Sequence, residues 1–265
     1  MTALRFAKAR VHHEFTFDEG YLALESPEPR IAAVQGHVYA RAKPLGKIEI
    51  MTFRTTFIAL TAAIAGTSAV AETELSFYLG AQTSPHSRVV GSNAGGDFDE
   101  LIGWEGRSAD APPYYGVRAT WWKNDTLGFG IELNHAKVYA PDDEAAAAGF
   151  DNVEFTDGLN ILTVNTMRRW PDRWGNFTPY VGAGIGLAIP HVDVDDGTNE
   201  TFEYQVTGPA VMGVAGAKYD ITDQWAVFGE YKFTYSQNEA ELEGGGTLES
   251  DIITNALNVG VSFNF

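Results

Sequence analysis

The stretch Leu257-Asn258-Val259-Gly260-Val261-Ser262-Phe263-Asn264-Phe265 closes the chain and decides its fold. Large apolar residues occupy every second position, and small or polar residues stand between them. Because a β-strand turns successive side chains to opposite faces, one face of this strand is apolar and the other is polar. An apolar outer face with a small, polar inner face is typical of a strand in a transmembrane β-barrel.

Seven earlier segments also alternate or have strand-like composition, so eight strands are predicted at 74–83, 114–122, 127–138, 158–169, 178–189, 204–219, 225–235 and 255–265. The connections are alternately short (Lys123–Thr126, Trp170–Phe177, Asp220–Gln224) and long (84–112, 139–157, 190–203, 236–254). This sorting predicts an all-β fold, an eight-stranded antiparallel up-and-down transmembrane β-barrel with tight periplasmic turns and long outer loops. A soluble β-sandwich could also hold eight strands, but it has no reason to sort its loops by length.

The chain contains a second start. Residues 51–71 are predicted to be a secretory signal peptide, with Met51, the basic Arg54, a short apolar core and the cleavage site Ala69-Val70-Ala71. We therefore expect residues 1–50 to be an unstructured upstream extension from a misassigned start codon; a genuine N-terminal extension is the alternative. The barrel then occupies residues 72–265. Its expected location is the bacterial outer membrane, after secretion across the inner membrane, and the only protein partners implied are the export and barrel-assembly machinery. A terminal Phe265 resembles the carboxy-terminal signal of outer-membrane barrels.

Charge is concentrated in the long connections. The whole chain has a formal net charge of −17, and the four long connections hold 21 acidic residues but only two bases, Arg88 and Arg107. Acidic loops can serve solvation and mutual repulsion. Clusters such as Asp142-Asp143-Glu144 could instead bind divalent cations, because carboxylates are hard oxygen ligands. A nucleic-acid partner is not expected, because this surface repels phosphates.

Alternation also identifies the residues inside the barrel. It places Arg118, Glu132, Glu230 and Lys232 on inward-facing positions, two of each sign. Side chains fill the interior of an eight-stranded barrel, and buried charges must be paired there. We therefore predict barrel-interior ion pairs among these four residues. A filled lumen argues against an open porin, which needs about 16 strands.

After the signal peptide the chain holds three histidines, His86, His135 and His191, and all three lie near the outer ends of predicted strands. Imidazole is suited to proton transfer near neutral pH and is a common metal ligand. The grouping could also arise by chance. In addition, alternation points His135 toward lipid rather than toward a shared site.

Several motifs resemble those of a known family, the lipid A oxidases. They are Tyr78–Gly80, Gln82–Arg88, Trp104–Arg107, Pro112–Arg118, His135–Tyr139, Phe155–Asn160, Thr178–Gly184, Gly208–Ala210 and Asp251–Ala256, and the resemblance spans residues 74–265. It implies oxygen-dependent oxidation of the proximal glucosamine of lipid A to an aminogluconate unit, in the outer leaflet and with a divalent cation. Outer-membrane lipid and lipopolysaccharide would then be the partners. Fold does not fix function, so a non-enzymatic structural or surface barrel is the alternative.

The implied chemistry suggests candidate residues, although the resemblance supplies no catalytic residue. The chain has no cysteine and no nucleotide-binding motif, so no nucleotide cofactor is expected. A divalent metal cation is the predicted cofactor, with His86, His135, His191, Glu105 and Asp157 as candidate ligands. Arg88 and Arg107 are candidate substrate-binding residues for lipid A phosphates or sugar carboxylates. Alternatively, both arginines form ion pairs within the acidic loops.

Overall fold

The computed structural model describes residues 72–171 and 173–265, without the side chains of residues 156 and 157. The predicted signal peptide (51–71) and upstream extension (1–50) lie outside the described residues. No helix in the described part of the chain is long and apolar enough to cross a membrane.

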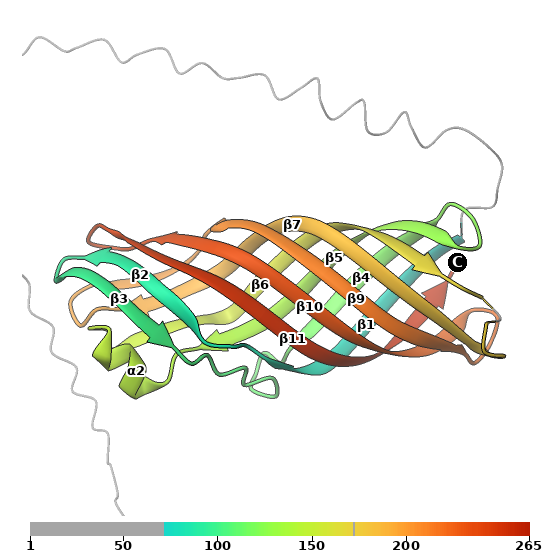
Figure 1. The fold of residues 1–265 in the computed structure, drawn as a ribbon, viewed down its shortest axis with the longest axis horizontal. Helices are drawn as coiled ribbons and strands as arrows, with labels where there is room; N and C mark the ends of the chain where they lie inside the picture. The colour runs from blue at the N-terminus through green and yellow to red at the C-terminus, as the bar shows by residue number, and fades with distance from the viewer. Residues whose placement is uncertain (1–71, 172) are drawn as a thin grey trace, which may run out of the picture. The chain divides into compact units, whose positions relative to one another are not determined.

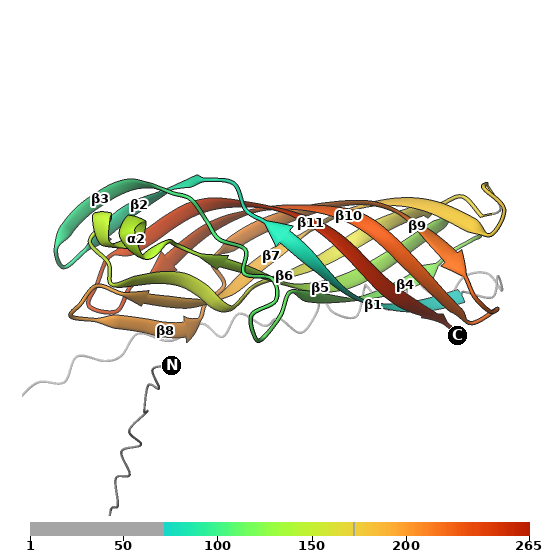
Figure 2. The ribbon, with the colours of Figure 1, turned by 90° about the horizontal axis from the view of Figure 1, so that it is seen from below.

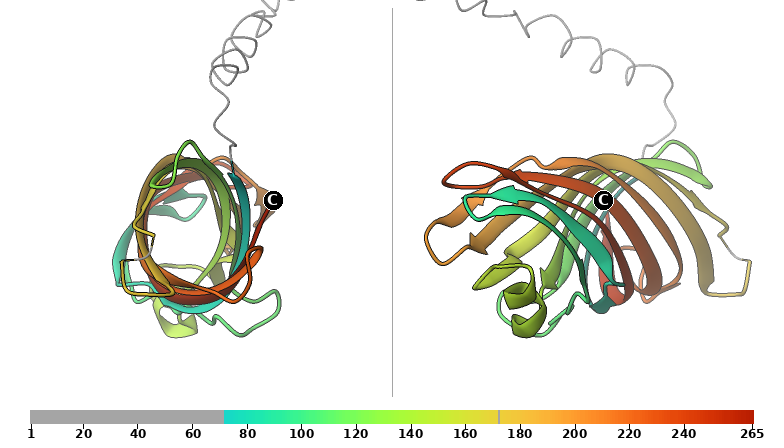
Figure 3. Two further views of the ribbon diagram at one scale, coloured as in Figure 1. Left: turned by 90° about the vertical axis from the view of Figure 1, so that its right-hand side faces the viewer. Right: turned by 60° about the vertical axis from the view of Figure 1, so that its left-hand side comes forward.

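Eight antiparallel strands form a closed barrel, seen from its end in Figure 3. In order around the wall they are β1 (Glu72–Thr83), β4 (Tyr115–Trp122), β5 (Leu127–Tyr139), β6 (Asn152–Arg169), β7 (Phe177–Asp195), β9 (Gly208–Asp220), β10 (Trp225–Glu241) and β11 (Thr247–Asn264). The barrel closes where β1 pairs with β11, from Glu74 opposite Asn264 to Thr83 opposite Asn255. The predicted eight-stranded barrel is therefore confirmed.

Three strands and a helix lie in segments predicted as loops. β2 (Ser87–Asn93) and β3 (Gly96–Ile102) form a hairpin on β11, β8 (Glu200–Tyr204) pairs with β7, and α2 (Asp142–Ala147) precedes β6. These elements gather at the end of the barrel opposite the C-terminus (Figures 1 and 2). The predicted strand 204–219 begins too early, because residues 205–207 connect β8 to β9.

We call residues 87–104, 138–159, 190–206 and 237–252 the outer half, and the remaining parts of the eight barrel strands the membrane half. In the membrane half, large apolar side chains on every barrel strand point outward and are exposed: Leu75, Phe77, Leu79, Val117, Trp121, Phe129, Ile131, Leu133, Leu162, Val164, Val181, Ile185, Leu187, Val211, Val227, Tyr231, Leu257, Val259 and Val261. The inward positions are mostly polar and buried, among them Ser76, Thr120, Thr163, Asn165, Thr234 and Ser262. This belt is the surface that contacts lipid.

The outer half has the opposite arrangement. Its inward side chains are mostly apolar and form a buried core: Val89, Ile102, Trp104, Val138, Phe150, Val153, Phe155, Leu159, Val192, Val194, Ala240, Leu242, Leu248 and Ile252. Its outward positions carry carboxylates, for example Asp193 on β7, Glu239 on β10 and Glu249 on β11. The outer half is therefore built like a water-soluble domain, with its apolar side chains inside.

Candidate functional site

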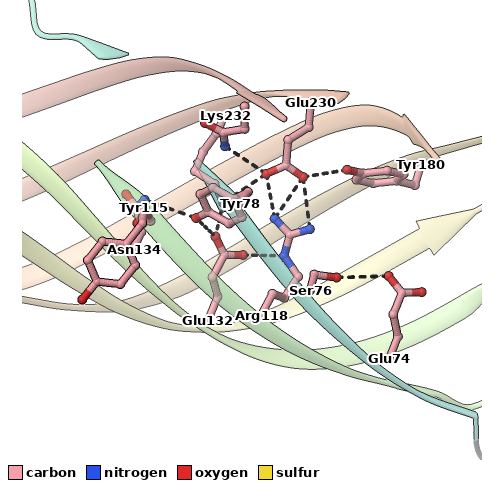
Figure 4. Close-up of polar contacts among 11 residues, drawn as sticks. Glu74, Ser76, Tyr78, Tyr115, Arg118, Glu132, Asn134, Tyr180, Glu230 and Lys232 are labelled. Carbon is pink, nitrogen blue, oxygen red and sulfur yellow. Dashed lines mark hydrogen bonds and ion pairs between the residues drawn. The ribbon is translucent and has the colours of Figure 1, made fainter. Parts of the chain in front are cut away.

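The four charged residues predicted inside the barrel meet in the membrane half (Figure 4). Arg118 on β4 reaches Glu132 on β5 (Nε to Oε2, 2.6 Å) and Glu230 on β10 (Nη2 to Oε1, 3.0 Å). Lys232 on β10 pairs with Glu132 and lies 3.9 Å from an oxygen of Glu230. All four side chains are almost fully buried, so each charge depends on the others for compensation.

Two tyrosines complete this interior network. The Tyr78 hydroxyl donates to Glu132 (2.6 Å), and the Tyr180 hydroxyl donates to Glu230 (2.7 Å). Gly116 faces the Tyr78 ring so closely that a Cβ at this position would lie 2.1 Å from its hydroxyl. Sequence reasoning missed both tyrosines, although both share the inward phase of their strands.

Below the network, towards the periplasmic turns, the interior is also filled. A cavity lined by Glu74, Arg118, Tyr180 and Lys218, among others, has a volume of about 10 Å³, close to the least that holds one water molecule. Lys218 Nζ donates a hydrogen bond to Glu74 (2.7 Å). At the periplasmic end of the barrel, both terminal nitrogens of Arg169 donate to the carboxylate of Glu72. The interior of the membrane half therefore acts as a structural plug.

A second polar group lies on the outer wall, directly above the apolar belt. On β5 the outward positions are Phe129, Ile131 and Leu133, and the next outward residue is His135. His135 is paired across the sheet with Asn160 on β6, one row beyond the apolar pair Leu133 and Leu162. On β5 and β6 the exposed apolar side chains end one row below this pair, so we expect lipid headgroups at this level.

Hydrogen bonds orient the His135 ring. Its Nδ1 lies 2.9 Å from Asn160 Oδ1, and Asn160 Nδ2 donates to the Gly158 carbonyl (3.3 Å). The amide of Asn160, itself held by the Gly158 carbonyl, therefore fixes the orientation of the imidazole ring through Nδ1.

Although it points outward, His135 is only 4% exposed. Its ring stacks on Tyr115 of β4, with centroids 4.9 Å apart and an interplanar angle of 23°. On the β6 side the strand bulges, since the β5–β6 register shifts between Ala136 and Val138. At this bulge Gly158 has a φ of +97°, and a Cβ there would lie 2.2 Å from the His135 ring. A bulge that needs glycine therefore shapes the pocket of the histidine.

The next outward residues of β5, Lys137 and Tyr139, contact a loop that lies against the outer wall. Lys137 is fully buried, and its ammonium group donates to the carbonyls of Asp110 (3.0 Å) and Pro112 (2.9 Å). Arg107 of the same loop lies 4.5 Å above the Tyr139 ring and pairs with Glu105 (2.9 Å). Arg107 has a φ of +27°, which is strained for a residue with a side chain.

Electrostatics on this wall reflect the excess of carboxylates. The pKa of Glu154 is raised from its ordinary value because partial burial disfavours the charged form and Asp193 adds repulsion; a hydrogen bond from Asn152 acts in the opposite direction. The pKa of Arg107 is raised by its hydrogen bond to Glu105. Its positive charge is therefore retained in the headgroup region.

The remaining candidate residues, His191, His86 and Arg88, lie at separate positions in the outer half and its loops. His191 lies outward on β7 between Phe202 and Tyr204, whereas His86 is exposed beside Gly103 and Glu144. Arg88 is exposed and pairs with Asp99, as the intraloop alternative expected.

The side chain of Asp157, a predicted metal ligand, lies outside the described residues. Among the described residues, no three His, Asp or Glu side chains converge to hold a metal ion. The described side chains therefore do not test the predicted metal site, which stays a prediction.

Comparison with known proteins bears on the whole barrel. Residues 55–265 match the outer membrane protein β-barrel domain family. Curated protein sequences give no match. Similar solved structures are the Neisserial surface protein A (15% identity, 73% of this chain and 97% of that chain, TM-score 0.43) and AlkL in lipid bilayers (15%, 76% and 94%, 0.45). OprG from Pseudomonas aeruginosa is also similar (11%, 74% and 96%, 0.43).

Proposed function

Because the chain belongs to the family of outer-membrane β-barrel proteins, we propose that it acts on lipid A in the outer leaflet, oxidising the proximal glucosamine to an aminogluconate unit with oxygen. One observation carries the proposal: an outward-facing, buried histidine, His135, is held by Asn160 in the first row above the lipid-facing belt. An imidazole suits proton transfer near neutral pH, and this one lies next to the surface where we expect lipid headgroups to contact the barrel.

The proposed reaction is a two-electron oxidation. In lipid A whose proximal anomeric hydroxyl carries no phosphate, the hemiacetal carbon loses its hydrogen and its hydroxyl proton, and molecular oxygen takes up the two electrons and two protons to give hydrogen peroxide. The resulting lactone adds water and opens to the aminogluconate, so the lipid gains one oxygen atom. In this scheme the imidazole of His135 accepts the hydroxyl proton, and Asn160 orients the ring.

Arg107 is proposed to bind an anionic group of the same lipid. Its guanidinium lies on the outer wall above His135, stacked on Tyr139. A guanidinium suits phosphate and carboxylate groups, both of which lipid A or its product would present. Glu105 would have to exchange its ion pair for the lipid, so this contact depends on competition between two anions.

Lipid A extracted from two strains tests the proposal, one lacking the gene and one expressing the full chain, both grown with oxygen. We expect a gain of one oxygen mass that requires both the gene and oxygen. His135→Ala should abolish the gain, and Asn160→Ala should lower it by about 10²-fold through loss of ring orientation. Asn255→Ala is the matched control, because this asparagine lies at the top of the belt on β11 and bonds Tyr231.

A non-enzymatic barrel is the second candidate. The filled interior of the membrane half favours it, since ion pairs among Arg118, Glu132 and Glu230 stabilise the wall without forming a site. Identical lipid A spectra from well-expressed protein would contradict the oxidase and leave this structural role. Full activity in His135→Ala would retain the oxidase but contradict the site.

A further inference from the structure

Three neighbouring apolar side chains on and just beyond β8 stand exposed on the outer half, whose outward face is otherwise mostly acidic. Phe202 and Tyr204 on β8 and Val206 just beyond it are 60%, 59% and 64% exposed. We call these three residues the β8 ridge. Phe202 pairs with Asp193 and Tyr204 with His191 on β7, whose side chains share the outward phase of Ile185 and Leu187.

The ridge lies above the hydrocarbon layer. His191, opposite Tyr204, is four residues beyond Leu187, which is about 13 Å along a strand that rises about 3.3 Å per residue. For a strand tilted by about 40° this places Tyr204 roughly 10 Å above the belt. At that level the neighbours of the barrel are lipid headgroups and saccharide rather than acyl chains.

His191 adds an unsatisfied polar atom to the ridge. Its ring packs edge-on against Phe202 and Tyr204, with centroids 4.4 Å and 4.7 Å away. The residue is only 5% exposed, and its Nδ1 is buried without a hydrogen-bond partner. Buried polar atoms are normally satisfied, so this Nδ1 is a candidate partner for a hydroxyl group of a ligand bound at the ridge.

We propose that the β8 ridge binds a sugar ring of lipopolysaccharide beyond lipid A. A pyranose ring offers an apolar C–H face to Phe202 and hydroxyl groups to Tyr204 and His191, which matches a ridge of aromatic surface with polar atoms at its edge. The ridge continues the lipid-facing surface of β7 upward, so the lipopolysaccharide molecule seated against Ile185 and Leu187 carries its saccharide past Tyr204.

Charge narrows the ligand to an uncharged part of the saccharide. Asp193 pairs with Phe202 and lies on the same outward face as the ridge. Its carboxylate repels phosphate groups at this level. The inference goes beyond the proposed oxidation and does not depend on it, because it concerns binding about 10 Å above the belt.

Binding measurements on the full chain, purified from outer membranes in detergent, test the ridge. The probes are purified lipopolysaccharide with a complete core saccharide and purified lipid A. We expect the core-bearing probe to bind the unaltered chain about tenfold more tightly than lipid A. The double variant Phe202→Ser, Tyr204→Ser should bind both probes equally, with its affinity for lipid A unchanged.

Trp174→Ser is the matched control, because Trp174 is an exposed aromatic residue in a periplasmic turn, 64% exposed. It should keep the tenfold preference. Electrophoretic mobility of the unheated barrel verifies that each variant is folded. The proposal is overturned if the double variant still binds the core-bearing probe more tightly than lipid A. It is also overturned if the substitutions lower the affinity for both probes by the same factor, which would assign the ridge to acyl chains. If lipid A from cells expressing the double variant still gains one oxygen mass, oxidation does not depend on the ridge.

Discussion

The same strands run through the membrane half and the outer half, but their apolar side chains point outward in the membrane half and inward in the outer half. On β10 the membrane half turns Val227 and Tyr231 outward and Lys232 inward, whereas the outer half of the same strand turns Glu239 outward and Ala240 inward. On β10 the alternation never changes phase, and only the surroundings of the wall change. The level at which polarity inverts therefore marks the edge of the hydrocarbon layer on each strand.

The two halves are stabilised by different forces. Inside the membrane half, stability depends on pairing, because a buried charge without its partner costs several kcal/mol. Inside the outer half it depends on apolar burial, at about 25 cal/mol per Å² removed from water. Each half should therefore be sensitive to a different kind of substitution.

The largest expected effect is in the membrane half. Arg118→Met leaves Glu132 and Glu230 buried with only Lys232 to compensate them, so we expect a loss of about 3–5 kcal/mol in the free energy of unfolding. Urea titration of the barrel refolded in lipid vesicles measures this loss.

A compensated variant sharpens this prediction. Arg118→Met combined with Glu230→Gln removes one charge of each sign and should recover most of the lost stability, because Lys232 then pairs with Glu132. If the single variant were as stable as the unaltered chain, the interior would be hydrated, and pairing would not be what stabilises the membrane half.

In the outer half the comparable test is Phe155→Ala, which removes a fully buried ring from the apolar core. We expect a loss of about 3–4 kcal/mol confined to this half. Hydrogen exchange should rise in peptides covering 152–159 and 190–195 while the strands of the membrane half stay protected. Phe129→Ala, on the lipid-facing belt, should leave exchange in the outer half unchanged. Equal loss of protection throughout would mean that the two halves unfold as one unit.

One strand can display the inversion directly. Val259 and Glu249 both point outward from β11, the first in the belt and the second in the outer half. Val259→Lys should cost about 2–4 kcal/mol in a bilayer, because it places a charge in hydrocarbon. Glu249→Lys should change stability by less than about 0.5 kcal/mol. Similar costs at both positions, measured by urea titration in the same vesicles, would refute the assigned hydrocarbon edge.

Sequence patterns predicted the membrane half well, because one face of each strand there is apolar. The stretch 257–265 identified β11, and phase alone placed Glu132 and Lys232 together inside. The same reasoning missed β2, β3 and β8. The outward residues of β2 and β3 are often charged and their inward residues apolar, so a search for an outward apolar face takes these two strands for loops. β8 has only five residues, two of them glutamates, and shows too little alternation to predict a strand.

The candidate site was only partly predictable. Alternation gave the outward direction of His135, and its position beyond Leu133 gave its level. Its partner Asn160 could not be assigned to a face, because the periodicity of this strand is ambiguous; the bulge at Gly158 accounts for that. The β8 ridge forms because β8 pairs with β7, and no local sequence signal predicts this pairing.

The smallest expected effect comes from the acidic outward face of the outer half. Burial and Asp193 raise the pKa of Glu154, so its ionised form is less favourable in the folded chain than in the unfolded one. The destabilisation is present at neutral pH and disappears as the pH falls below the ordinary value of 4.5, where Glu154 is protonated in both states. Glu154→Gln keeps an acceptor for Asn152 and should therefore stabilise the outer half at pH 7, by less than about 0.5 kcal/mol since the group is partly exposed. Below pH 4.5 the variant and the unaltered chain should unfold alike. Hydrogen exchange of residues 152–159 at pH 7 measures this difference. If the variant were less stable, the carboxylate would contribute more through its contacts than it loses by repulsion. The outer half would then tolerate its charge as readily as the membrane half tolerates Glu132.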